Sequence, residues 1–224
     1  MSQPRGPAAS LMSALHRPIY RARLRALTGL ILPHLCPGDR VLDVGCGFGE
    51  LGAALMAHPG CPSRVAVEGL ERVKRGGEKI PVAEYDGRTI PFADGAYHAV
   101  ILADVLHHEP DPDRLLAECA RVASRVVLLK DHARNGLLAQ QRISLIDWAA
   151  NAPYGVPCLY RYNSVDEWRA VAARHGLRTA GERTSINLYP PVVNALVGRS
   201  LQYFAALEKP TPPTPANAPE EAAP

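Results

Sequence analysis

The run Val41–Glu50, which reads VLDVGCGFGE, constrains the fold of this chain more than any other segment. An apolar stretch that ends in an acid and then meets alternating glycines predicts a buried strand, a tight turn and the start of a helix. Gly45, Gly47 and Gly49 lack a Cβ atom, so the backbone there can adopt positive φ and approach a ligand closely. The run therefore predicts a nucleoside-binding turn, with an ordinary glycine-rich turn as the alternative.

The glycine spacing distinguishes two kinds of cofactor. A dinucleotide site has the pattern G-x-G-x-x-G and binds a pyrophosphate at the helix N-terminus. Here the third glycine comes one residue early, and Glu50 brings a negative charge to the position that requires glycine. The run resembles motif I of the class I S-adenosylmethionine (SAM)-dependent methyltransferases, an acid followed by G-x-G-x-G. This resemblance implies that Asp43 and the three glycines bind SAM, which carries a sulfonium and no phosphate.

Composition favours one α/β domain with short additions. A chain of 224 residues with 47% hydrophobic content can bury one sizeable core. We expect an N-terminal helical segment at 1–37 packed on the core, a SAM-binding domain at 38–207 and a disordered Pro-rich tail at 208–224. Because the first acid is Asp39, the arginine-rich start could alternatively be a transit peptide.

Several classes of protein are disfavoured. The five cysteines form no C-x-x-C pair, so neither a zinc site nor a disulfide framework is expected, and scattered thiols favour a cytoplasmic protein. The apolar stretch Ile186–Leu207 is interrupted by Pro190, Pro191 and Arg199, so no membrane span is expected. A net charge of +3 is too small to indicate nucleic acid, and we expect no such partner.

Strand and helix patterns alternate after the glycine turn. Four apolar runs predict further strands, at 64–67, 80–85, 97–103 and 125–129. With a helix at 111–122, this alternation predicts a Rossmann-like, doubly wound sheet of about seven strands, mostly parallel with one antiparallel strand, and helices on both faces. The segments 177–183 and 184–189 would supply the last two strands. Ser164–Glu167 matches a capping box, which predicts a helix that begins there.

An acid after the second strand is expected to bind the ribose. In nucleoside-binding α/β folds, a carboxylate about twenty residues beyond the first turn accepts hydrogen bonds from the ribose hydroxyls. Glu68 and Glu71 both lie near that distance. We favour Glu71, because Gly69–Glu71 resembles the glycine-apolar-acid ending of the second strand in this methyltransferase family. A surface glutamate is the alternative.

Two further motifs strengthen the resemblance. The stretch Asp86–Asp94 resembles the family segment whose first aspartate lies beside the adenine amino group, which implies that Asp86 and Gly87 contact the cofactor. Asp86 could otherwise simply begin a turn with Gly87. Asp104, after the fourth strand, is also expected at the cofactor. Together the motifs, over about residues 40–132, resemble the methyltransferase-11-type branch of class I. The chain departs from it in the Arg121–Arg125 turn and in having glutamate on the second strand.

Three histidines are candidates for acid–base chemistry. Positioning supplies most of the catalysis of methyl transfer from a sulfonium, and a general base is needed only where the acceptor must lose a proton. Imidazole titrates near neutral pH, so His107, His108 and His132 are the candidates, although each could be simply packed or solvated. Asp104 and Asp131 resemble the metal-ligand positions of catechol-type O-methyltransferases, but no third carboxylate or amide is evident and we expect no metal.

The segments that follow the fifth strand are expected to face the acceptor. Residues 130–132, 146–152 and 160–163 resemble a subgroup of small bacterial-type methyltransferases. Side chains expected to line an acceptor pocket are Trp148, Asn151, Tyr160 and Tyr162, of which the aromatic ones could instead be core.

DNA amino-methyltransferases resemble one another in an N/D-P-P-Y element, which this chain replaces with Asp104–His107.

The combined pattern predicts a SAM-dependent methyltransferase that acts on a small-molecule acceptor, with transfer to oxygen or carbon favoured. A non-catalytic protein that keeps the fold and binds a ligand or partner is the main alternative. A nicotinamide-dependent reductase is a third interpretation, which the glycine spacing disfavours.

Overall fold

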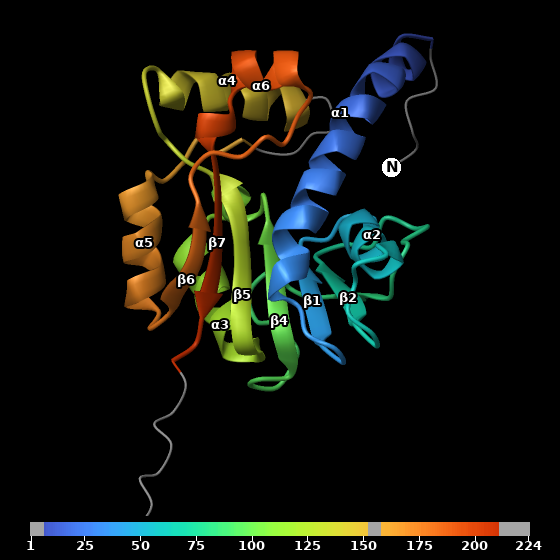
Figure 1. The fold of residues 1–224 in the computed structure, drawn as a ribbon, viewed down its shortest axis with the longest axis vertical. Helices are drawn as coiled ribbons and strands as arrows, with labels where there is room; N and C mark the ends of the chain where they lie inside the picture. The colour runs from blue at the N-terminus through green and yellow to red at the C-terminus, as the bar shows by residue number, and fades with distance from the viewer. Residues whose placement is uncertain (1–6, 152–157, 211–224) are drawn as a thin grey trace, which may run out of the picture.

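The computed structural model describes residues 7–151 and 158–210. It contains one seven-stranded sheet in the order β3-β2-β1-β4-β5-β7-β6 (Figure 1). The strands are β1 (Arg40–Val44), β2 (Ala66–Glu71), β3 (Val82–Glu84), β4 (Tyr97–Ala103), β5 (Ala123–His132), β6 (Arg178–Arg183) and β7 (Gln202–Glu208). The neighbouring pairs from β3 to β5 are parallel, whereas β7 is antiparallel to both β5 and β6. The predicted fold class is therefore confirmed.

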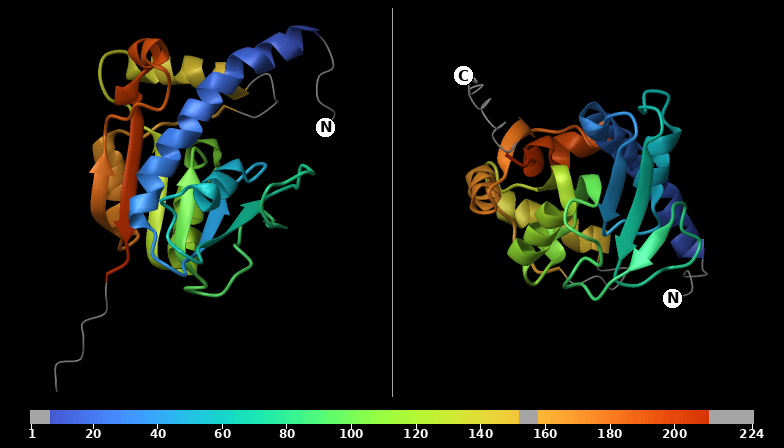
Figure 2. Two further views of the ribbon diagram at one scale, coloured as in Figure 1. Left: turned by 45° about the vertical axis from the view of Figure 1, so that its right-hand side comes forward. Right: turned by 90° about the horizontal axis from the view of Figure 1, so that it is seen from below.

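Helices cover both faces of the sheet. The α-helices are α1 (Pro7–Ile31), α2 (Glu50–Ala57), α3 (Pro112–Val122), α4 (Ala139–Asn151), α5 (Val165–Arg174) and α6 (Pro191–Val197), and the short 3₁₀ helices are η1 (Leu32–His34), η2 (Leu106–His108) and η4 (Arg199–Leu201). The helices α1 and α2 lie on one face, and α3 and α5 on the other (Figures 1 and 2). Above the end of the sheet where β5 terminates lie α4 and α6 (Figure 1).

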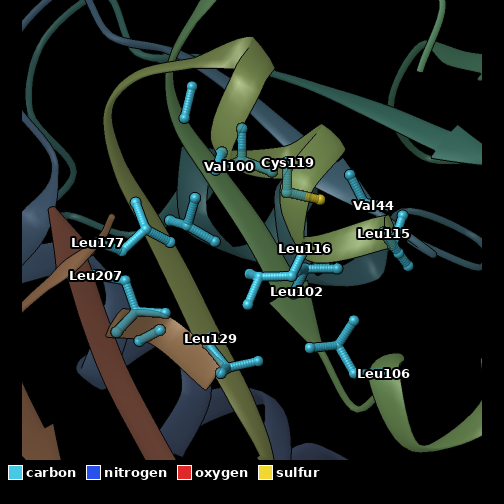
Figure 3. Close-up of a cluster of buried hydrophobic side chains, with 14 of the residues drawn as sticks. Val44, Val100, Leu102, Leu106, Leu115, Leu116, Cys119, Leu129, Leu177 and Leu207 are labelled. Carbon is cyan, nitrogen blue, oxygen red and sulfur yellow. The ribbon is translucent and has the colours of Figure 1, made fainter. Parts of the chain in front are cut away.

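Strand residues alternate between two hydrophobic clusters, because successive side chains of a strand point to opposite faces of the sheet. Val100 and Leu102 of β4 pack with Leu116 of α3 in one cluster, part of which is shown in Figure 3. Ile101 faces the other way and joins Leu27 of α1 in the second cluster. Burial on both faces explains why β4 reads as a continuous apolar run in the sequence.

The last strand differs from the prediction. The segment 184–189 is irregular, and the strand that completes the sheet is β7, which inserts between β5 and β6. Ile186 and Leu188 are buried in alternation, which imitates a strand pattern, but a turn joins the Leu188 amide to the Ile186 carbonyl. The apolar run of β7 is typical of a strand with neighbours on both sides. Because residues 202–208 can pair with β5 on one side and with β6 on the other, this later segment forms the strand instead of 184–189.

The C-terminal part of α1 packs on the sheet. Leu27 and Ile31 of α1 and Leu35 after η1 are buried in the cluster that contains strand β1 and helix α2. At the other end, β7 includes Glu208, and the Lys209 amide donates to the Arg125 carbonyl. The rest of the expected tail, 211–224, lies outside the described residues, and the proposed division into three segments stays a prediction. No described helix is both long and apolar enough to cross a membrane.

Helix α5 provides a test of local stability. The Ser164 hydroxyl accepts a hydrogen bond from the Glu167 amide, and the Glu167 carboxylate accepts one from the Ser164 amide, which confirms the capping box. We expect Ser164→Ala to lower the free energy of unfolding by about 1 kcal/mol, because it leaves a helix N–H without its partner. Denaturant unfolding would measure the loss, and Ser164→Asp, which keeps a capping acceptor, should show little of it.

Candidate active site

The glycine turn after β1 has the conformation that its sequence predicts. Gly45, Gly47 and Gly49 have φ of +71°, +60° and +71°, in the left-handed region that side chains rarely adopt. A Cβ atom on Gly49 would lie 2.4 Å from Ile80 Cγ1, so this glycine is required by packing. A Cβ on Gly47 would meet nothing nearer than Arg75, at 3.9 Å. The turn therefore presents its backbone to open space at Gly47.

Glu71 at the end of β2 lies directly beside this turn. Its Oε1 accepts a 2.6 Å hydrogen bond from the Gly47 amide, and the Arg75 guanidinium lies 3.7 Å from the same oxygen. Glu68 lies elsewhere: its carboxylate accepts from the Tyr97 hydroxyl and faces Arg40, at the start of β4 and β1. The structure thus brings Glu71, and not Glu68, to the glycine turn.

Asp43 is a buried acid of β1, two residues before the glycine turn begins at Gly45. It is 2% exposed, and its Oδ2 has no hydrogen-bond partner among the described residues. Burial raises its pKa to about 7; Arg23 opposes this rise and Glu71 adds to it. An orphan carboxylate oxygen of this kind suits a cationic donor.

Asp86 and Gly87 follow β3 at the same edge of the sheet. The exposed Asp86 accepts hydrogen bonds through Oδ1 from the amides of Arg88 and Thr89, at 2.7 and 2.9 Å, and these bonds lower its pKa. This is the turn that the sequence offered as the alternative for Asp86. Gly87 has φ of +75° and packs under Arg72. The expected contact of both residues with adenine stays a prediction.

Asp104 links β4 to two cations. Its Oδ2 accepts from Nη2 of Arg23 at 2.6 Å, and its Oδ1 accepts from the Lys130 ammonium. Burial would raise its pKa, but Lys130 and Arg23 hold it well below its usual range. Asp104 also adopts a φ of +62°, and strained residues of this type cluster at functional sites. Asp104 therefore fixes α1 and β5 to the end of β4, and its expected cofactor contact stays a prediction.

A buried polar cluster begins next to Asp104. His107 of η2 is buried, and its Nδ1 lies 2.6 Å from Oδ1 of Asp131 at the end of β5. Burial lowers the pKa of His107, but the Asp131 carboxylate outweighs this effect, so the pKa is raised. His108 lies alongside, with the two ring centroids 4.0 Å apart. The pair of His107 and Asp131 is the histidine–carboxylate arrangement typical of acid–base sites.

His132 belongs to the same cluster but is in a different electrostatic state. Burial and the Lys130 ammonium lower its pKa to about 4, so the ring is neutral at physiological pH. Its ring centroid lies 4.9 Å from that of His107, and its backbone carbonyl accepts a 2.8 Å hydrogen bond from the Trp168 indole. The structure therefore brings together all three candidate histidines at the carboxyl end of β5.

The cluster is closed by α4 and the segment before α5. Asp147 of α4 is buried, and its Oδ2 accepts a 2.6 Å hydrogen bond from the Tyr162 hydroxyl. Of the expected acceptor-pocket residues, Tyr162 lies in the cluster, whereas Trp148 and Tyr160 are 54% and 43% exposed. Asn151 falls outside the side chains that the structure describes.

Sequence reasoning missed three residues of the site. Arg23 and Lys130 bind Asp104 across 81 and 26 positions of chain, so no local spacing could indicate them. Asp147 had a weak signal, since it is an acid at a buried position of α4 between the apolar Ile146 and Trp148. A buried acid on a helix indicates a polar partner, although it does not identify that partner.

Comparisons with known proteins agree with this geometry. A family model described as a methyltransferase domain matches residues 42–126. The phosphatidylethanolamine N-methyltransferase of Cereibacter sphaeroides is 34% identical over 114 residues, which cover 44% of this chain and 53% of the relative. The 2-phytyl-1,4-naphtoquinone methyltransferase of Synechococcus elongatus is 30% identical over 148 residues, which cover 58% and 63%. The chain thus spans less than two thirds of either relative.

The fold is shared with solved structures. The crystal structure of magnesium protoporphyrin IX methyltransferase from Synechocystis, which contains bound SAH, matches with a TM-score of 0.56 and 16% identity over 86% of this chain and 84% of that one. At this identity the likeness shows the fold alone. The family model therefore shows a methyltransferase domain at residues 42–126, with SAM as the cofactor of that domain, and the glycine turn lies within it.

Proposed function

We propose that this chain transfers the sulfonium methyl group of SAM to a small-molecule acceptor, at an oxygen or a carbon atom. The observation that carries the proposal is the Gly47–Glu71 hydrogen bond, which joins the turn to the acid of β2 at the edge where the polar cluster lies. The two curated relatives are named for a nitrogen-bearing lipid and for a naphthoquinone. The acceptor atom of this chain does not follow from these two names, and oxygen or carbon is part of our proposal.

The residues at the glycine turn suit SAM. Gly47 leaves open space where a Cβ would stand, and Asp43 offers a buried carboxylate oxygen without a partner in the described structure. Glu71 would bind the ribose hydroxyls, and Asp43 would face the positively charged end of the cofactor. When bound, SAM supplies an electrophilic methyl group. The chain itself orients the cofactor, excludes water and places the acceptor in line, which is where most of the rate enhancement arises.

We place the acceptor between the polar cluster and a nearby hollow. An open hollow of about 670 Å³ is bordered by Tyr189, Arg142 and Asn194. Tyr189 lies close enough to Asp104 and Arg23 for their charges to influence its pKa. The volume is within the range of small-molecule sites, about 300 to 1,000 Å³. At the inner end, one of the candidate histidines His107, His108 and His132 would accept a proton from the acceptor. Cytoplasmic location is part of this proposal, because the described cysteines form no disulfide bond.

Asp43 provides a test with two opposite effects. Burial raises the pKa of Asp43 in the folded protein from the ordinary 3.8 to about 7, so the free energy of unfolding falls as the pH rises through this range. At pH 8 the buried charge destabilises the free protein, and we expect Asp43→Asn to raise its melting temperature. The same variant should weaken SAM binding about tenfold or more, since a hydrogen bond to a charged group is lost.

Calorimetry with SAM and thermal unfolding at pH 6 and pH 8 would measure both effects of Asp43→Asn. The stabilisation should be smaller at pH 6, where the acid of the wild type is mostly protonated. A variant that binds SAM like the wild type and melts lower at pH 8 would contradict the proposed role.

Methyl transfer is tested by incubating the protein with methyl-labelled SAM and fractionated metabolite extracts. We expect label in a low-molecular-weight product that depends on Glu71. A protein that binds SAM but labels no fraction would support the non-catalytic alternative, and label only in nucleic acid would refute the small-molecule acceptor.

A further inference from the structure

We propose that His107, His108 and Asp147 bind one divalent transition-metal ion of the zinc class. Nε2 of His107 lies 3.8 Å from Oδ1 of Asp147, and Nε2 of His108 lies 3.9 Å from the same oxygen. One ligand atom from each of the three residues lies within 4.8 Å of the others. Two imidazoles and a carboxylate form a donor set that such ions prefer.

The two histidine–aspartate separations are close to what an ion requires. Zinc lies about 2.0 to 2.2 Å from nitrogen and oxygen ligands, which places two ligands of a tetrahedral ion about 3.4 Å apart. The two histidine–aspartate separations exceed this by about 0.4 to 0.5 Å, a difference that small side-chain rotations remove. The two histidines belong to η2, which follows β4, and Asp147 belongs to α4, which follows β5.

Neighbouring residues orient the ligands as they do in metal sites. His107 directs Nδ1 to the Asp131 carboxylate, so that Nε2 faces Asp147. A histidine ligand typically donates its other ring N–H to a carboxylate, which fixes the ring and its tautomer. The Tyr162 hydroxyl donates to Oδ2 of Asp147, and Oδ1 of the same carboxylate faces the two imidazoles. Two of the three ligands, His107 and Asp147, therefore have a supporting hydrogen bond.

Charge favours this set over a second one nearby. Asp104, His107 and His132 also have ligand atoms within 4.8 Å of one another. However, Asp104 already accepts from the Arg23 guanidinium and the Lys130 ammonium, which would repel an added cation. Asp147 has a fully buried side chain, and a buried carboxylate is stabilised by a nearby cation.

The site also indicates a class of acceptor. Three protein ligands leave at least one position of a zinc-type ion open, as in catalytic rather than structural sites. A hydroxyl or carboxylate oxygen of the acceptor would occupy that position. This second part rests on the proposed methyl transfer, whereas metal binding does not.

Metal binding is tested on the full chain after treatment with a chelator, by titration with Zn²⁺ in competition with a chromogenic chelator. We expect one ion per chain in the wild type. His108→Ala and Asp147→Asn should each weaken binding by at least tenfold, and Tyr162→Phe by about 10- to 100-fold. The matched control is His58→Ala, because this exposed histidine lies at the end of α2 and should leave the affinity unchanged.

The outcomes separate the two proposals. A wild type that takes up no zinc would overturn the metal site, as would equal affinities in the wild type, His108→Ala and Asp147→Asn. The His108 side chain is 20% exposed, more than those of His107 and Asp147, so its variant should keep the wild-type circular dichroism spectrum even if Asp147→Asn does not. Zinc binding by a protein that transfers no methyl group would support the metal site and overturn the proposed function instead.

Discussion

Replacing Asp104 by asparagine should lower the free energy of unfolding by about 3 to 5 kcal/mol, the cost of removing one partner from a buried ion pair. Asp104 bridges Arg23 of α1 and Lys130 of β5, and the Lys130 side chain is 1% exposed. Without the carboxylate, a buried ammonium and a guanidinium face each other with no anion between them. Equilibrium unfolding in denaturant would measure this loss.

An exposed ion pair of the same chain supplies the control for this prediction. Asp94 lies 2.8 Å from Arg121, but its side chain is 81% exposed, so Asp94→Asn should cost no more than about 1 kcal/mol. Equal losses for the two variants would show that the Asp104 cluster is as well solvated as the surface, contrary to our account.

Loss of the Glu71 carboxylate should weaken SAM binding by roughly 10- to 150-fold, because a hydrogen bond to a charged group contributes about 1.5 to 3 kcal/mol. Part of this effect would come from the turn itself, since Glu71 also accepts from the Gly47 amide. Calorimetric titration of Glu71→Ala with SAM would measure the change in dissociation constant.

Glu68→Ala is the matched control for Glu71→Ala. Both acids belong to β2, but Glu68 contacts Tyr97 and Arg40 rather than the glycine turn. We expect it to bind SAM like the wild type. If Glu71→Ala kept the wild-type dissociation constant while Glu68→Ala lost affinity, the ribose role would belong to Glu68.

Local pattern predicted most of the cofactor side of the site. The glycine turn and the strand before it depend on backbone sterics and on apolar periodicity, which are properties of adjacent residues. The position of Glu71 followed from the length of one βαβ unit, which sets how far along the chain the second strand ends. These features could be predicted because each arises within about thirty residues of sequence.

Pairings between distant segments could not be predicted in the same way. The contact of Arg23 with Asp104 depends on where α1 crosses the sheet, and the contact of His107 with Asp147 depends on how α4 covers its end. Neither contact produces a recognisable residue spacing in the sequence. The misplaced last strand has the same origin, because β7 is selected by its pairing with β5 and β6 rather than by its own pattern.

We propose that SAM binds where Gly47 leaves space at the turn. The most direct test is calorimetric titration of the wild type, Gly47→Ala and Gly38→Ala with S-adenosylhomocysteine. Both glycines have positive φ and room for a Cβ, so both variants pay the same backbone cost of about 1 to 2 kcal/mol, but only Gly47 faces the proposed cofactor. We predict one saturable site in the wild type and in Gly38→Ala, and a large loss of affinity in Gly47→Ala. Equal binding by all three, or binding of NAD(P) in place of S-adenosylhomocysteine, would contradict the account.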